Sequence, residues 1–172
     1  MTVKAPDSEP KQPSADESAE SAPSARPSAP TKKKEEPRAP APDPDVRRAL
    51  VTGFSLLAVS IPFGVTLEAL HGFKVEAYLA SEMRREMWRL SHAHGTLLGI
   101  LCLVFAALAE RHVPKKARHS VTLQLTAGAL LMPIGFFLGG ILNSEGDPSL
   151  AIVLVPIGAL LLVSALGRSA LG

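Results

Sequence analysis

Three histidines and one glutamate are the side chains of this sequence whose types and spacing suit the binding of a metal ion or a haem: Glu68, His71, His92 and His94. Glu68 and His71 are three residues apart, so roughly 60° separates them around a helix and both can face one partner. His92 and His94 are two residues apart, or roughly 160° around a helix, and a regular helix cannot direct both at one ion. Because His92 is nearer to the small residues of its segment, we expect it to point inward. His94 should then face another neighbour or the membrane interface.

Two cofactor chemistries fit these residues. A b-type haem needs one imidazole from each of two neighbouring helices, and His71 with either His92 or His94 would supply them. Room for the macrocycle and charges for its propionates would come from nearby glycines and arginines: Gly64, Gly95, Gly99, Arg84, Arg85 and Arg89. A transition-metal ion, such as zinc, copper or iron, would instead use Glu68, His71 and His92 as three ligands. In the alternative, each histidine is neutral and forms a polar contact between helices.

Four apolar segments must position these side chains. Their ranges are 49–70, 90–109, 121–142 and 150–167. A helix rises about 1.5 Å per residue and the hydrocarbon core of a bilayer is about 30 Å thick, so about 20 residues cross it. The chain is 47% hydrophobic but only 5% aromatic, which favours helices over a membrane β-barrel with its aromatic girdles. We predict an all-α integral membrane protein.

Small residues at helical spacing indicate how the segments pack, because membrane helices associate where their backbones approach closely. The second segment carries a stripe of Ser, Gly, Cys and Ala, and the third contains a G-x-x-x-G at 135–139. Together with the alternation of sides, this predicts a compact four-helix up-down bundle for residues 46–172. Homo-oligomerisation through one of these glycine faces is the competing use of the same residues.

The connection between the first two segments has an apolar face of its own. Apolar residues recur every four positions in it: Val75, Leu79, Met83 and Met87. Charged residues lie between them. This pattern over 74–88 predicts either an amphipathic helix in the membrane interface or an extension of the second span that begins at Ser81.

The charges between the segments indicate an orientation. Seven basic residues would gather on one side, with Glu110 as the one acid there: Arg47, Arg48, Arg111, Lys115, Lys116, Arg118 and Arg168. On the other side, basic and acidic residues balance. By the positive-inside rule both termini then lie in the cytoplasm, and residues 71–89 and 143–149 lie outside. We expect the bacterial inner (plasma) membrane, with the lipid bilayer as a partner and the inner-loop charges attracted to anionic headgroups.

Residues 1–45 differ in composition from the rest of the chain. They hold ten of the 15 prolines, interleaved with Ala, Ser, Lys and Glu, and are almost free of large apolar side chains. Such a segment cannot bury enough apolar surface to offset its chain entropy. We predict a disordered cytoplasmic tail rich in Pro, Ala and Ser.

The sequence carries few features that are typical of other function classes. A net charge of +2 without a basic recognition helix argues against nucleic acid, and no phosphate-binding, hydrolase or paired-cysteine motif occurs. We assign no catalytic residues.

The leading hypothesis is a membrane protein that binds haem or a metal ion. Its alternative is a structural or assembly factor of a larger membrane complex, without a cofactor. A small-solute transporter is disfavoured because there are only four spans and no charged site at the midplane.

Two stretches resemble a known group of proteins. They are L-E-A-L-H-G-F-K at 67–74 and S-H-A-H-G-T-L-L-G at 91–99. Both resemble small bacterial four-span membrane proteins of unknown function, which carry a His-x-His at the head of their second helix. More distantly, they are similar to membrane subunits that ligate haem through histidines at helix ends. The resemblance implies the fold of residues 46–172, and it makes His71, His92 and His94 candidate haem ligands.

Overall fold

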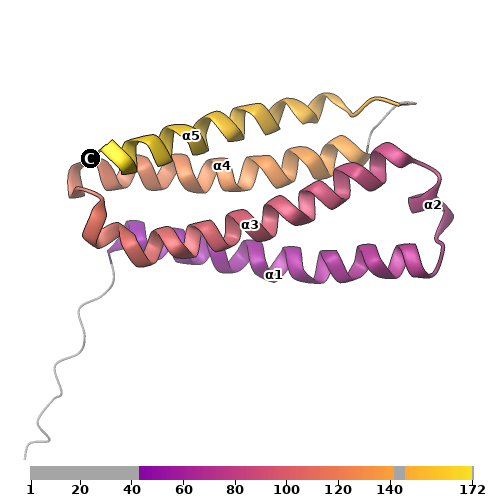
Figure 1. Ribbon diagram of the computed structural model, residues 1–172, viewed down its shortest axis with the longest axis horizontal. Coiled ribbons are helices and arrows are strands. Elements are labelled where there is room, and N and C mark those ends of the chain that lie inside the picture. The colour runs from indigo at the N-terminus through magenta and orange to yellow at the C-terminus, as the bar shows by residue number, and fades with distance from the viewer. Residues whose placement is uncertain (1–42, 142–145, 172) are drawn as a thin grey trace, which may run out of the picture. The chain divides into compact units, whose positions relative to one another are not determined.

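The computed structural model describes residues 43–141 and 146–171. The regular elements in these ranges are helical: α1 (Pro44–Gly72), α2 (Glu76–Leu79), α3 (Glu82–His112), α4 (Lys115–Ile141), the short 3-10 helix η1 (Leu150–Val153) and α5 (Leu154–Leu171). The four long helices α1, α3, α4 and α5 run up and down alongside one another (Figure 1). The predicted all-α up-down bundle is therefore confirmed. The predicted disordered tail lies outside the described residues, apart from its last three.

Each long helix is apolar enough to cross a bilayer. By length and composition, the candidate membrane spans are Pro44–Gly72, Glu82–His112, Lys115–Ile141 and Leu150–Leu171, the last of which joins η1 to α5. In α4, 50% of the most apolar stretch is buried inside the protein, against 17% in Leu150–Leu171. The other apolar side chains lie on the outside of the bundle, where contact with water would be unfavourable and contact with lipid would not. The four predicted apolar spans are thus present as helices, apart from residue 142 of the third span, which lies outside the described residues.

The helices pack in the order of the chain. α1 lies against α3, α3 against α4 and α4 against α5, with a smaller contact between α1 and α4. We name the two ends of the bundle after one residue of each, Arg118 and His71. The arginine end holds Asp43 before α1, Val113 after α3 and Arg118 in α4. The histidine end holds His71 near the end of α1 and Arg89 near the start of α3.

Two helix pairs cross at glycines. A Cβ added to Gly53 of α1 would lie 2.9 Å from the Gly99 carbonyl oxygen of α3. One added to Gly128 of α4 would lie 2.7 Å from the Gly158 carbonyl oxygen of α5. Because real Cβ atoms do not come so close, glycine is what permits both crossings. These glycine faces are filled by the chain's own helices, so homo-oligomerisation would need other surfaces.

The connection between α1 and α3 contains two turns of different kinds. Lys74 adopts a left-handed conformation with φ of 53°, which ends the turn after α1 and leads into α2. Ser81 then caps α3, because its hydroxyl oxygen accepts a hydrogen bond from the backbone N–H of Arg84 at 3.2 Å. The structure agrees with the alternative in which the second span extends back to Ser81. The first half of the predicted amphipathic segment forms the separate helix α2.

The arginine end is closed by an ion pair between a buried arginine and a partly exposed aspartate. Arg118 is only 4% exposed, and its Nη1 lies 2.6 Å from Asp43 Oδ2. Its Nη2 donates to the carbonyl oxygens of Val113 at 3.1 Å and Glu110 at 3.4 Å, near the C-terminus of α3. Attraction to lipid headgroups was the sequence-based interpretation of this charge. That interpretation is wrong for Arg118, because the fold turns its side chain inward to join α1, α3 and α4.

Candidate functional site

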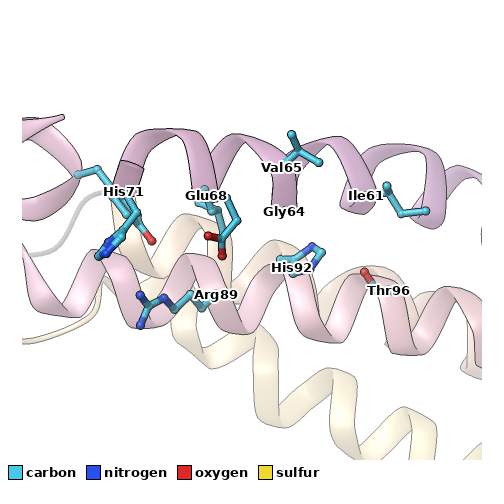
Figure 2. Close-up of a pocket in the computed structure, with 10 residues that line it drawn as sticks. Ile61, Gly64, Val65, Glu68, His71, Arg89, His92 and Thr96 are labelled. Atoms are coloured by element: carbon cyan, nitrogen blue, oxygen red, sulfur yellow. The ribbon is translucent and has the colours of Figure 1, made fainter. Parts of the chain in front are cut away.

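A cleft of about 560 Å³ lies between α1 and α3 toward the histidine end. We call it the α1–α3 cleft, and Figure 2 shows its lining. Ten residues line it: Ile61, Gly64, Val65, Leu67, Glu68, His71, Tyr78, Arg89, His92 and Thr96. Three of the four residues predicted to bind a cofactor or metal, Glu68, His71 and His92, are therefore in one cleft. The fourth, His94, is not among its lining residues.

His92 is held in a defined orientation at the wall of the cleft. Its Nδ1 lies 2.8 Å from the Ser60 carbonyl oxygen of α1. A carbonyl oxygen only accepts, so Nδ1 carries the hydrogen and Nε2 of the neutral ring is left as an acceptor. Gly64 makes the room, because a Cβ at that position would lie 2.8 Å from Nδ1 of the ring. The α1 backbone thus fixes both the place and the tautomer of this imidazole.

Glu68 and His71 lie further along the same wall. Glu68 comes one turn after Gly64, and His71 comes seven residues after it, or about 10 Å along the helix axis. Figure 2 shows the Glu68 carboxylate between the two imidazoles, with Arg89 lying along α3, and Arg89 also lines the cleft. His71 and His92 therefore do not face each other across the cleft. Within residues 43–141 and 146–171, no group of three or more His, Cys, Asp or Glu side chains is close enough to hold a metal ion.

Most polar atoms of the cleft have no protein partner. Among the described residues, the side chains of Glu68, His71 and Arg89 form no hydrogen bond or ion pair with one another or with their neighbours. The Thr96 hydroxyl is buried without a partner. Tyr78 is 2% exposed, and its hydroxyl also has no hydrogen bond within the described ranges. The cleft therefore gathers a carboxylate, a guanidinium, two imidazoles and two hydroxyls whose bonding capacity is largely unused.

His94 points to the other side of α3. Its ring lies on Phe136 of α4, with ring centroids 4.8 Å apart, and its Nδ1 is 2.9 Å from the Leu90 carbonyl oxygen of its own helix. We expected His92 to point inward and His94 to face another neighbour or the membrane interface; His92 lies against α1, and the neighbour of His94 is α4. The 160° between the two side chains places one against α1 and the other against α4.

Tyr78 and Thr96 are cleft residues that sequence reasoning did not identify. Tyr78 comes from α2, and its ring stacks on Trp88 with centroids 6.1 Å apart. Trp88 in turn stacks on Phe137 of α4 at 5.7 Å. Thr96 carried a usable signal, because it follows His92 by four residues and so shares its helix face. Tyr78 carried none, because only the turn after α1 brings α2 over the cleft.

The known proteins offer no guide to what this cleft holds. Comparison of the chain with protein-family models, with curated proteins and with solved structures finds no match.

Proposed function

We propose that this protein is an integral membrane protein that binds a ligand in the α1–α3 cleft. In this proposal His92 is the central contact, and Glu68, His71 and Arg89 surround the polar end of the ligand. One observation carries the proposal, which is the set of polar side chains in the cleft without a protein partner. Glu68, His71 and Arg89 are exposed, whereas the Thr96 hydroxyl is buried, and a buried polar group left unsatisfied costs about 1–3 kcal/mol, so such a group usually has a partner. A bound ligand would supply that partner.

A haem does not fit the cleft as its side chains stand. The two axial ligands of a b-type haem approach one iron from opposite faces. His71 and His92 are instead separated along the cleft, with Glu68 between them (Figure 2). His94 is directed at Phe136 of α4, which removes it as the partner of His71. The residues present therefore do not supply two facing imidazoles.

A metal ion fits part of the arrangement. Metal-ligating histidines commonly donate their second ring N–H to a carbonyl, and the Nδ1 contact of His92 with Ser60 has this form. Glu68 is the neighbouring oxygen donor. A third protein ligand requires the exposed His71 side chain to turn toward them, because no group of three ligands stands together in the described residues. His92 with Glu68 is accordingly the part of the metal hypothesis that the geometry supports best.

Purification in a mild non-ionic detergent followed by native mass spectrometry tests the proposal. We expect a small molecule retained at one copy per chain. Thr96→Leu fills the cleft next to His92 and should abolish the retained mass. Thr66→Leu is the matched control, because Thr66 lies on the exposed side of α1 and bonds only to the Pro62 carbonyl oxygen. The control should keep the mass.

The same preparations identify the ligand class. An absorption band of haem, or one equivalent of a metal by elemental analysis, would support the cofactor hypotheses, with His92→Ala expected to lose it and His94→Ala to keep it. A colourless, metal-free protein that retains an organic molecule would contradict both cofactor hypotheses and keep the ligand-binding function. Equal retention by the Thr96 and Thr66 variants, or no retained mass at all, would overturn the function itself.

The assembly-factor hypothesis has less support. An assembly factor of this kind would meet its partner complex through the small-residue faces of its helices, but Gly53, Gly99, Gly128 and Gly158 pack inside the bundle. The resemblance to small four-span membrane proteins is supported by no matching family model or curated protein, and it adds no function to either hypothesis.

We also infer an orientation with the arginine end in the cytoplasm. It holds Arg47, Arg48 and the basic start of α4, which supports the positive-inside assignment, since that rule counts Lys and Arg. A reporter that is active only in the cytoplasm, fused at either terminus, tests it. Activity at neither terminus would contradict the inference.

A further inference from the structure

The geometry points to a phosphoethanolamine headgroup, carried by a membrane phospholipid, as the ligand of the α1–α3 cleft. This inference rests on the proposed function, because it names the ligand of that same site.

The inference begins from two opposite charges. Glu68 from α1 and Arg89 from α3 line the same cleft (Figure 2), yet they form no ion pair with each other. A single anion would leave Glu68 unpaired and repelled, and a single cation would do the same to Arg89. A zwitterion satisfies both.

The donors and acceptors of the cleft match the two halves of that zwitterion. A guanidinium binds phosphate oxygens through paired hydrogen bonds, which assigns the phosphate to Arg89. A primary ammonium has three N–H donors and needs acceptors. Glu68 supplies the carboxylate that accepts from the ammonium. His92 lies nearer the middle of the bundle, against Gly64, where its Nε2 is an acceptor on the acyl-chain side of the headgroup because Nδ1 is committed to the Ser60 carbonyl oxygen. A quaternary ammonium cannot donate such bonds, so the cleft should distinguish ethanolamine from choline.

The walls of the cleft change from polar to apolar along α1. His71 and Glu68 line its polar part, and Val65 and Ile61 line the part nearer the middle of the helix. Val65 and Ile61 are 66% and 56% exposed. From His71 to Ile61 the helix rises about 15 Å, which is about half the thickness of a hydrocarbon core. A lipid with its headgroup at Glu68 and Arg89 can therefore lay its acyl chains along Ile61 and Val65.

Delipidated protein in a non-ionic detergent, titrated with defined lipids, tests the inference. The probes are phosphatidylethanolamine, phosphatidylcholine and phosphatidylglycerol of one acyl composition, and soluble glycerophosphoethanolamine. Binding is read by native mass spectrometry and by the fluorescence of Trp88, which is the chain's single tryptophan and lies against Tyr78 of the cleft wall. We expect phosphatidylethanolamine to bind about tenfold more tightly than either other phospholipid, and the soluble headgroup to bind more weakly than the lipid.

Charge variants assign the preference to the cleft. Glu68→Gln should reduce the preference for ethanolamine over choline to about twofold or less, and Arg89→Gln should weaken all three phospholipids. Glu86→Gln is the control, because Glu86 is an exposed acid of α3 that does not line the cleft. It should leave the preference unchanged.

The failures of the two proposals are distinguishable. Equal binding of the three phospholipids, or a preference that survives Glu68→Gln, would overturn the headgroup inference. Soluble glycerophosphoethanolamine binding as tightly as the lipid would overturn the assignment to a membrane lipid. If Thr96→Leu still abolishes a retained mass in those cases, the cleft remains a ligand site. If Thr96→Leu changes nothing for any probe, both proposals fail.

Discussion

Two arginines at opposite ends of the bundle have opposite surroundings. Arg118, at the arginine end, is 4% exposed and bonds to Asp43 and to the carbonyl oxygens of Val113 and Glu110. Arg89, at the histidine end, is exposed and has no partner among the described residues, although Glu68 lines the same cleft. The Arg118 guanidinium is paired within the protein through both terminal nitrogens, although its Nε is buried without a partner, and this pairing is the pattern of a structural contact. At the second end, Arg89 and Glu68 remain available to bind a ligand.

The largest expected difference between the two ends appears when each guanidinium is removed in turn. Arg118→Met leaves the carbonyl oxygens of Val113 and Glu110 without their partner, and we expect a loss of about 3 kcal/mol in the free energy of unfolding, to which the partly exposed Asp43 contributes little. Arg89→Met is the matched change at the other end, and it should alter the free energy by no more than about 0.5 kcal/mol. Thermal unfolding in detergent, followed by Trp88 fluorescence, measures both. Equal losses would remove the contrast between the two ends.

A smaller effect is expected from filling the space that His92 occupies. Gly64→Leu places side-chain atoms where the imidazole packs, and overpacking of this kind costs about 1–3 kcal/mol. Gly72→Leu is the control, because a Cβ at that position has no atom within 4 Å. The same unfolding measurement should show a lower melting temperature for the Gly64 variant alone. A stable Gly64 variant would mean that the ring can leave the cleft wall freely.

The arginine end should also depend on pH. The backbone N–H of Asp45, which donates to Asp43, and then the Arg118 guanidinium hold the pKa of Asp43 below its usual value of 3.8. A carboxyl group with a lowered pKa stabilises the folded state above its unfolded pKa, and that stability is lost as pH falls through the lower, folded value. The melting temperature should therefore decrease below about pH 4. Asp43→Asn should be less stable at neutral pH and lose less on acidification. A variant with the wild-type pH dependence would contradict this assignment.

The smallest expected effect separates the two histidines of the H-x-H pair. His92→Phe loses the hydrogen bond to the Ser60 carbonyl oxygen and should cost about 1 kcal/mol. His94→Phe keeps an aromatic ring on Phe136 and loses only a contact with its own helix, so the change should stay within about 0.5 kcal/mol. Ligand retention should respond to His92→Phe and not to His94→Phe. Similar responses from both variants would place both histidines at one site.

Much of the candidate site was predictable because helix geometry is regular. The three-residue spacing of Glu68 and His71, and the opposite directions of His92 and His94, follow from 100° per residue, and the structure has both. The position of His92 against Gly64 was not predictable, because it depends on where α3 crosses α1. Arg118 was misread for a related reason. Its charge suggested a surface position, and only the fold shows Asp43 close enough to be its partner.

By itself, the sequence determined the number, order and apolar character of the four long helices, because length and hydropathy are properties of each segment alone. It also determined which side chains share a helix face. Only the tertiary structure decided which charges are paired. Arg118 is paired because α1, α3 and α4 meet around it, whereas Glu68, Arg89 and His92 line a cleft because the α1–α3 contact leaves space there. Pairing depends on the distance in space between segments far apart in the chain. The pattern of residues within one segment cannot predict that distance.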